Sequence, residues 1–318
     1  MKRKFLSSLL IIGLLTFGIS CSNSKTADKI EVAKGTGEPN ASTDKNDILT
    51  GEMTVIVDEA ATSILNEQLE VFRSSYVNTK IQVISKPERE AINSLIQGDG
   101  SMAILARELT ERESAGFGNR QITPRIFPIW NDGVVFVNNI SSPDTSINVQ
   151  TLSSLMKGDA SGKTLLLDNI NSSMVRKVKE FSKVDQISAK SVQAMKTSTE
   201  VLKQIETNVN AIGIVSYSQY LDYRRQFGEE NKIRILSLQN TGSDGKTVFT
   251  KPSQTTFATE EYPLKTTFYV LNYQPNMGLG IGFSAFLTGD RGQRVVLKSG
   301  LLPVTMPGRE ILIRDNIN

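Results

Sequence analysis

Short apolar runs rich in β-branched residues alternate along this chain with segments whose apolar residues recur at helical spacing. Residues 53–57 (MTVIV) form the first run, and four apolar residues between 64 and 72 follow at helical spacing. Runs at 80–84 and 102–105 then flank a helical segment at 88–96. This strand–helix–strand–helix–strand order is typical of a parallel sheet with helices between its strands. The chain is therefore expected to fold as an α/β protein.

A second series of the same kind begins near Phe127. Expected strands lie at 133–137, 165–167, 211–215 and 233–238, and expected helices at 149–156, 172–181, within 191–209 and around 217–223. The stretch 240–262 is expected to be a loop, followed by a returning strand at 265–271 and helices at 278–288 and 291–299. The two series, together with a strand near the end of the chain that returns to the first series, predict two lobes joined by crossover strands. The first lobe would comprise residues 51–127 plus 263–318, and the second residues 128–262.

The first 20 residues have the pattern of a secretory signal peptide. Three basic residues precede an apolar stretch at 5–17, and small residues precede Cys21. That stretch is shorter than the about 20 apolar residues that span a bilayer. A cysteine at this position resembles a bacterial lipobox, although Gly18 stands where a lipobox usually has Leu. We expect cleavage before Cys21 and lipidation of its sulfur; the alternative is a plain secreted protein in which Cys21 is incidental.

Residues 21–50 are expected to form the lipidated end and a flexible tether. Polar and small residues dominate the segment after Cys21, which has no aromatic side chain and cannot bury enough apolar area to offset its ordering entropy. A coil of this length spans roughly 30 Å. The folded part would then lie in the periplasm, anchored to a membrane.

Charge and composition exclude several function classes. Of 36 Lys and Arg, three lie in the signal segment, so the remaining basic residues equal the 33 acids and give no reason to expect nucleic-acid binding. The chain contains no histidine and no cysteine besides Cys21. Histidine-based catalysis and a structural zinc site are therefore excluded. We expect no metal, no cofactor and no enzyme activity.

Two glycine-containing segments resemble phosphate-binding motifs only in part. In 158–164 (GDASGKT), Lys157 stands where a P-loop needs its first glycine, and a strand rather than a helix is expected next. In 278–282 (GLGIG), no strand precedes the glycines. The first is expected not to bind nucleotide, and the second to be a helix start or a close helix contact.

Two features are candidates for anion binding. Ser172 and Ser173 precede an amphipathic helix, where hydroxyls and free N–H groups accept negative charge. Arg107 ends an apolar strand, at the sheet edge where open α/β proteins bind ligands. The alternatives are an ordinary N-cap for the serines and, for Arg107, a surface ion pair with Glu108, Glu111 or Glu113.

Six segments, in order, resemble the PstS-like phosphate-type substrate-binding proteins of ABC transporters. They are 102–110 (MAILARELT), 128–138 (PIWNDGVVFVN), 152–158 (LSSLMKG), 210–217 (NAIGIVSY), 262–269 (YPLKTTFY) and 283–304 (FSAFLTGDRGQRVVLKSGLLPV). The resemblance covers roughly residues 53–305. It implies the two-lobed type II periplasmic-binding-protein fold, with mixed, mostly parallel sheets, helices on both faces, hinge crossover strands and a ligand in the interlobe cleft.

The resemblance also implies ligand-binding positions. They are Asp58, Glu59, Ala60, Ala61 and Thr62 in the first loop, Arg107 at the strand end, and Asn171, Ser172 and Ser173 in the second lobe. The chain departs from the family pattern at several of these places. The first loop is acidic instead of rich in Gly, Ser and Thr, Ser101 replaces a usual Asp, and Asp168 stands where an anion-clamping Arg is usual. Acids near the cleft repel a dianion unless they are compensated.

The sequence therefore predicts a monomeric, membrane-anchored solute-binding lipoprotein. It would capture a small oxyanion, phosphate first among them, and present it to an ABC permease. The acidic departures favour an alternative with the same fold: an envelope sensing or interaction lipoprotein whose cleft has diverged or takes a ligand other than phosphate.

Overall fold

The computed structural model describes residues 47–159, 162–228, 232–241 and 245–308. All of them belong to one compact unit. The predicted signal peptide, the lipidation at Cys21 and the tether up to residue 46 lie outside the described residues.

The first lobe follows the predicted strand and helix order closely. Strand β1 pairs in parallel with β2 on one side and with β3 on the other. The helices α1 and α2 connect these strands, as predicted. The bounds are β1 (Gly51–Asp58), α1 (Thr62–Ser75), β2 (Thr79–Lys86), α2 (Glu88–Gln97) and β3 (Met102–Leu105).

Helices cover both faces of this sheet because successive strand residues point to opposite sides. In β1, Val55 and Val57 pack into a core with Phe72 of α1, whereas Ile56 packs with Ile92 of α2 on the other face. Burial of both faces explains why β1 is apolar without alternation.

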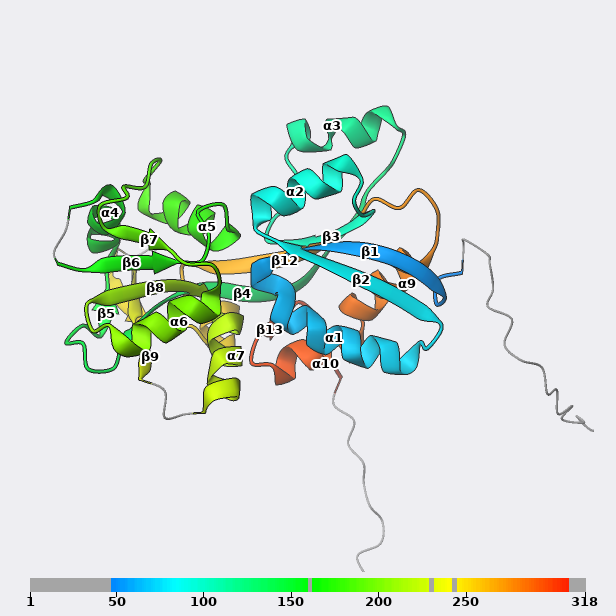
Figure 1. Ribbon diagram of the computed structural model, residues 1–318. Helices are drawn as coiled ribbons and strands as arrows, with labels where there is room; N and C mark the ends of the chain where they lie inside the picture. The colour runs from blue at the N-terminus through cyan, green and yellow to red at the C-terminus, as the bar shows by residue number, and fades with distance from the viewer. Residues whose placement is uncertain (1–46, 160–161, 229–231, 242–244, 309–318) are drawn as a thin grey trace, which may run out of the picture. The chain divides into compact units, whose positions relative to one another are not determined.

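Two long strands join the lobes (Figure 1). Strand β4 (Arg125–Asn139) pairs with β12 (Lys265–Asn272) up to Gly133, and with β8 (Ala211–Ser216) from Val134 onward. The ladders that β4 and β12 form with each other, and those that they form with β8 and β3, are antiparallel. Strands β1, β2 and β3 pair in parallel, as do β6, β7 and β8, so the sheet is mixed. The strand order is β2-β1-β3-β12-β4-β8-β6-β7. The partner of β4 thus changes from β12 to β8 between residues 133 and 134, a few residues after residue 128, where the second lobe was predicted to begin.

The second lobe repeats the α/β alternation around β6 and β8, which pair in parallel. Its helices α4 and α5 precede and follow β6, and α6 and α7 flank β8. The bounds are β5 (Ser146–Ile147), α4 (Val149–Lys157), β6 (Thr164–Leu167), α5 (Ser173–Ser182), β7 (Val192–Ala194), α6 (Ser198–Thr207), α7 (Tyr217–Phe227) and β9 (Ile233–Ile235). The segment 158–164 leads into strand β6, whereas a P-loop leads into a helix. The segment is therefore not a P-loop, as predicted.

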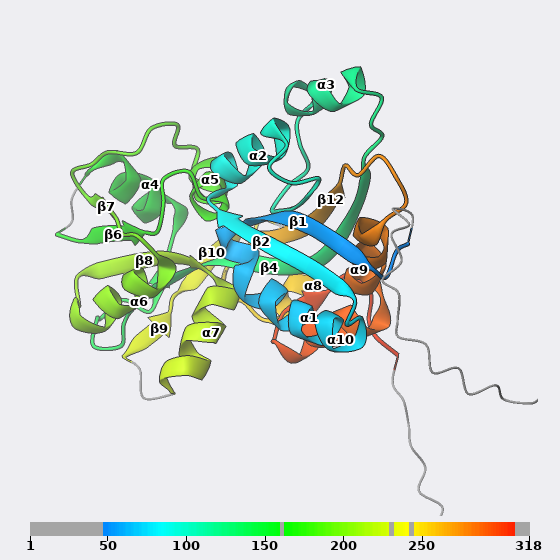
Figure 2. The same ribbon diagram turned by 45° about the vertical axis from the view of Figure 1, so that its right-hand side comes forward.

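The last part of the chain returns to the first lobe (Figure 2). The helices α9 (Leu279–Thr288) and α10 (Asp290–Lys298) pack beside α1, and β13 (Leu302–Pro303) pairs with β4. The Phe72 ring lies 4.9 Å from Phe283 and 5.2 Å from Phe286, centroid to centroid. Gly278 is the N-cap of α9, so the GLGIG segment is a helix start, as expected.

The expected strand at 233–238 is divided between β9 and β10, the short strands β5 and β7 were not predicted, and two further parts of the chain differ more strongly from the sequence prediction. The prediction of a loop at 240–262 is wrong, because this stretch contains the end of β10 (Ser237–Thr241), β11 (Thr247–Thr250) and α8 (Gln254–Ala258). Strand β11 is mostly exposed, so it lacks an apolar pattern and depends on its pairing with β10. The helix α3 (Glu111–Asn119) was not predicted: two glycines lower its propensity, and its start is a capping box of Thr110 and Glu113.

No helix in the described ranges has the length and apolar character needed to cross a membrane.

Candidate functional site

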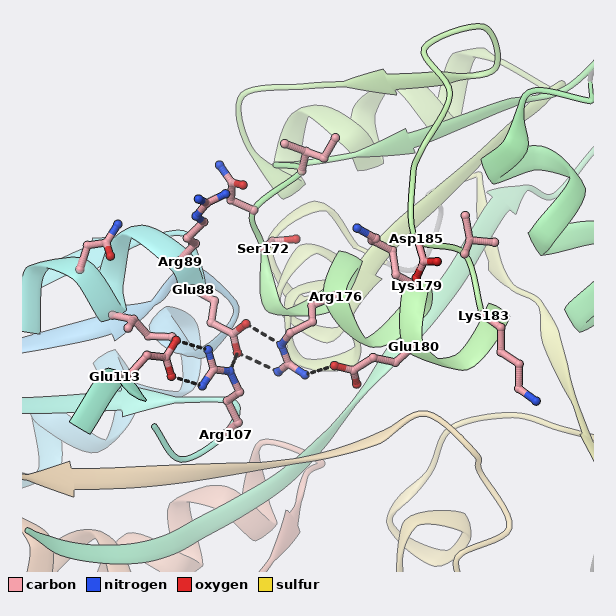
Figure 3. Close-up of a pocket in the computed structure, with 15 residues that line it drawn as sticks. Glu88, Arg89, Arg107, Glu113, Ser172, Arg176, Lys179, Glu180, Lys183 and Asp185 are labelled. Carbon is pink, nitrogen blue, oxygen red and sulfur yellow. Dashed lines mark hydrogen bonds and ion pairs between the residues drawn. The ribbon is translucent and has the colours of Figure 1, made fainter. Parts of the chain in front are cut away.

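A large cavity lies between α2 of the first lobe and α5 of the second (Figure 3). It has a volume of about 800 Å³. Arg107 lies on its wall, as do Asn171 and Ser172 from the loop that leads into α5. Three predicted ligand-binding positions from both lobes thus meet at one cavity.

A buried carboxylate joins the two lobes at this cavity. Glu88 is the first residue of α2, and its side chain is only 5% exposed. Arg176 of α5 donates to it twice, from Nε at 2.6 Å and from Nη2 at 2.8 Å. This paired geometry is the strong, planar form of an arginine–carboxylate contact. Glu88 and Arg176 therefore hold α2 and α5 together across the lobes.

Arg107 approaches the same carboxylate from the first lobe. Its Nε lies 3.8 Å from Glu88 Oε1, while its two terminal nitrogens donate to Glu113 at 2.7 and 2.8 Å. These hydrogen bonds raise the pKa of Arg107 and lower that of Glu113 to about 2. Arg107 therefore forms an ion pair with Glu113, which is one of the three partners that the alternative interpretation of Arg107 named. Glu88 lies between two guanidinium groups, one from each lobe.

The first predicted loop lies deeper between the lobes. Asp58 is fully buried and caps the short 3-10 helix η1 (Glu59–Ala61) by accepting the Ala60 N–H at 3.1 Å. Burial raises the pKa of Asp58 to about 7; the Ser173 hydroxyl acts in the opposite direction, and the charges of Glu88 and Asp168 raise it further. The contact with Ser173 does not reach hydrogen-bond geometry. Asp58 Oδ2 and Ser173 Oγ are thus buried without a hydrogen-bond partner among the described residues.

The other first-loop residues do not face the large cavity. Ala60 and Ala61 are buried in the core. Glu59 and Thr62 line a separate pocket of about 230 Å³ beside α7. Burial, followed by the charge of Asp168, raises the pKa of Glu59 to about 7.

The second-lobe loop has a capped helix start but no cation at its acidic position. Ser172 accepts the Val175 N–H at 3.3 Å, which makes it the N-cap of α5. Asp168 is buried, which raises its pKa, and its Oδ1 accepts the Asn169 N–H at 2.7 Å. Asp58, Asp168 and Ser173 thus form an acidic contact between the lobes, in which neither acid forms an ion pair with a described arginine.

A third contact between the lobes lies near the crossover. Asp132 is buried and accepts hydrogen bonds from the Gly133 N–H and from both the N–H and the hydroxyl of Ser218. The Ser218 hydroxyl also lies 3.3 Å from the carbonyl oxygen of Ala60. The lobes are therefore closed upon each other at the hinge as well as at the cavity.

Glu88 and Arg176 were not among the residues predicted from the sequence. Glu88 follows strand β2 and is the first residue of α2, so its place at the end of a strand could be predicted from the sequence, but its partner could not. Arg176 lies four residues beyond Ser172, on the first turns of a helix whose start was predicted to bind an anion. Only the spatial approach of α2 and α5 shows that these two residues meet.

No group of three or more metal-ligating side chains is present in the described part of the chain.

The fold and the cleft together define a two-lobed protein of the solute-binding class. A family profile of the PBP superfamily domain matches residues 36–291. The chain belongs to this periplasmic-binding-protein superfamily. Among curated proteins, no match to the chain was found.

Solved structures show the same fold at low sequence identity. One is a protein from Clostridium perfringens described as a phosphate ABC transporter substrate-binding protein with bound phosphate, which is 16% identical and has a TM-score of 0.66; the match covers 80% of this chain and 100% of that one. An ABC-type phosphate transport receptor from Vibrio cholerae is 17% identical, with a TM-score of 0.61 and coverage of 79% and 99%.

The fold also occurs outside transport. The regulatory domain of CcmR from Synechocystis, in complex with 2-PG, is 15% identical, with a TM-score of 0.51 and coverage of 75% of this chain and 96% of that domain. The family and these neighbours are binding proteins rather than enzymes.

Proposed function

We propose that this protein is a lipid-anchored solute-binding protein of the bacterial envelope that captures a small anion between its lobes for an ABC-type permease. Arg107 from the first lobe and Arg176 from the second both approach the Glu88 carboxylate across the cleft. This arrangement is the observation that carries the proposal, because it is a site built to hold a negative group between the lobes. A ligand that contacts both arginines would favour the closed form.

Inorganic phosphate is the first ligand to test, since the names of two similar structures refer to phosphate. The two arginines supply the donors for such an anion. The ionised forms of Asp58 and Asp168 oppose a dianion that enters more deeply, because like charges repel strongly in a buried site. A phosphate would therefore have to bind on the Arg107 and Arg176 side of the cleft.

Calorimetric titration of the purified protein with phosphate, sulfate and molybdate tests anion capture directly. We expect heat of binding with at least one anion and its loss in Arg176→Gln. A folded protein that binds no anion of any kind would refute the proposal.

The lipid anchor is tested separately on Cys21. We expect the protein to incorporate a labelled fatty acid in bacterial cells, and Cys21→Ser to lose the label and leave the membrane fraction. Equal labelling of the two proteins would contradict the anchor without affecting anion capture.

A second function is favoured by one specific observation. Glu88 already holds Arg176, Glu113 holds the terminal nitrogens of Arg107, and Asp168 stands where the resemblance implies an anion-binding Arg. A chain with these features could keep its lobes closed without a solute and act as an envelope sensing or interaction lipoprotein. Co-purification with a membrane complex that contains no permease would support this second function, and co-purification with a permease would support transport.

A further inference from the structure

We infer that the cavity between α2 and α5 binds an organic anion through a carboxylate group that displaces Glu88 from Arg107 and Arg176. This inference rests on the proposed solute-binding function and specifies the ligand class of that site. Glu88 would then act as an internal ligand, which occupies the arginines until an external carboxylate replaces it.

The contact made by Glu88 shows which chemical group fits between the arginines. Arg176 holds the two carboxylate oxygens through Nε and Nη2, at 2.6 and 2.8 Å. The planar fork of arginine matches a planar carboxylate in this way. Arg107 Nε lies 3.8 Å from Oε1, on the first-lobe side. An external carboxylate in the same place would find the same donors without movement of either guanidinium group.

The cavity is larger than an inorganic anion requires. Its volume of about 800 Å³ falls within the roughly 300–1,000 Å³ of pockets that bury organic small molecules. Part of its wall is apolar, because Ile92, Ile170 and Val184 line it. An organic body attached to the carboxylate would fill this space and cover Ile170, whose side chain is otherwise exposed.

The remaining charges of the wall favour a ligand with more than one negative group. Arg89, Lys179 and Lys183 line the cavity, and none of them forms an ion pair with a residue that the structure describes. The acids Glu88, Glu113 and Glu180 are each paired with an arginine, and Asp185 is the remaining acid of the wall. The unpaired charge around the cavity is therefore mainly positive.

An internal ligand lowers the apparent affinity for an external one. When only a fraction of the protein has its arginines free, the apparent dissociation constant rises by the inverse of that fraction. Replacing Glu88 by a neutral side chain of the same shape removes the competitor while Arg107 and Arg176 remain. The variant should therefore bind an organic carboxylate more tightly than the natural chain, the opposite of the usual effect of a substitution at a binding site.

The test is calorimetric titration of the intact protein with tricarballylate, a flexible organic tricarboxylate, beside inorganic phosphate. Glu88→Gln should bind tricarballylate about tenfold more tightly than the natural protein. Arg176→Gln should lose the interaction. Glu180→Gln is the matched control, because Glu180 also contacts Arg176, at 2.9 Å from Nη1, but lies on the same helix and does not join the lobes. It should stay within about twofold of the natural protein.

A thermal melt of the natural protein provides a second measurement that does not depend on a variant. Tricarballylate should raise the unfolding midpoint as its concentration increases, by mass action on the folded state. The same additions should leave the midpoint of Arg176→Gln unchanged.

Two results would overturn the inference. One is the absence of tricarballylate binding by the natural protein and by folded Glu88→Gln, and the other is equal tightening in Glu180→Gln, which would show a general charge effect. If phosphate still binds in these experiments, only the ligand class is wrong and the solute-binding proposal stands. If neither probe binds, the solute-binding proposal fails as well.

Discussion

The contact between the lobes has two sides that treat buried carboxylates differently. On the arginine side, formed by Glu88, Arg107 and Arg176, the carboxylate is held by a guanidinium group from each lobe. On the acidic side, formed by Asp58, Asp168 and Ser173, neither carboxylate forms an ion pair with a residue that the structure describes, and burial raises the pKa of both acids.

The difference shows that two buried carboxylates of one protein can have different partners. Glu88 joins the lobes through its ion pairs, whereas a buried acid without an ion pair is favoured as the neutral form. The arginine side is therefore suited to exchange one anion for another. The acidic side is suited to a protonated contact that weakens as pH rises.

Loss of Arg176 should produce the largest change in stability. Arg176→Ala leaves Glu88 buried with Arg107 as its remaining cation, and breaking a buried pair in this way should lower the free energy of unfolding by about 3 kcal/mol. Urea denaturation at pH 7 measures this. A loss below about 1 kcal/mol would place this contact with ordinary surface ion pairs and remove the contrast between the two sides.

The pH dependence of stability should come mainly from the acidic side. The pKa of Asp58 rises from 3.8 to about 7 on folding, so the folded chain keeps a proton that the unfolded chain has lost between these values. The free energy of unfolding should therefore fall as pH rises from about 4 to about 7. Asp58→Asn stays neutral and can still cap η1 through its side-chain oxygen, so it should recover on the order of 2 kcal/mol at pH 8.

Asp132→Asn is the matched control for this pH effect. Asp132 is equally buried, and burial raises its pKa to about 6, but its oxygens accept hydrogen bonds from Gly133 and Ser218. An amide cannot accept all of them, so this variant should be less stable at both pH 5 and pH 8. Equal behaviour of the two Asn variants would contradict the distinction between a buried acid with one hydrogen bond and a buried acid with three.

An exposed ion pair between the lobes should have a smaller effect. Arg225 of α7 donates to Glu67 of α1 at 2.7 Å, and the two side chains are 47% and 35% exposed. Arg225→Ala should lower the free energy of unfolding by less than about 1 kcal/mol, because water and salt screen the pair. Urea denaturation at low and high salt gives the comparison with Arg176→Ala, whose effect should depend less on salt.

The smallest effect is expected from a pair within one helix. Glu180 lies four residues from Arg176 on α5, and its side chain is 57% exposed. Glu180→Gln should change the free energy of unfolding by about 0.3 kcal/mol. A larger loss in the same denaturation experiment would mean that Glu180, and not Glu88 alone, orients Arg176.

Most of the first lobe could be predicted from the sequence because its elements have strong apolar patterns. Strand β3 is a continuous apolar run, β1 contains three successive apolar residues (55–57), and α1 has a clear helical period, so local pattern and tertiary burial agree. Strand β11 and helix α3 were missed for the opposite reason. One depends on pairing with β10, and the other begins with a capping box but carries two glycines.

The candidate site was predictable only in part. Arg107 was found because a charged residue ended an apolar strand, and Ser172 because a hydroxyl preceded a helix. Glu88 and Arg176 carry no local signal that separates them from other charged residues in the first turns of surface helices. They matter because the fold brings them together: Glu88 and Arg176 are 88 residues apart in the chain, yet Arg176 Nε lies 2.6 Å from Glu88 Oε2.

The sequence by itself determined the α/β class, the two-lobed organisation and the acidic character of the first loop, because these depend on local apolar spacing and residue identity. Only the tertiary structure decided which acid is paired. Ion pairing depends on distances of a few ångströms between elements that the crossover strands bring together, and a carboxylate in the sequence does not reveal whether it will meet a guanidinium group or another carboxylate. That choice separates Glu88, held between two arginines, from Asp58, buried beside a hydroxyl group.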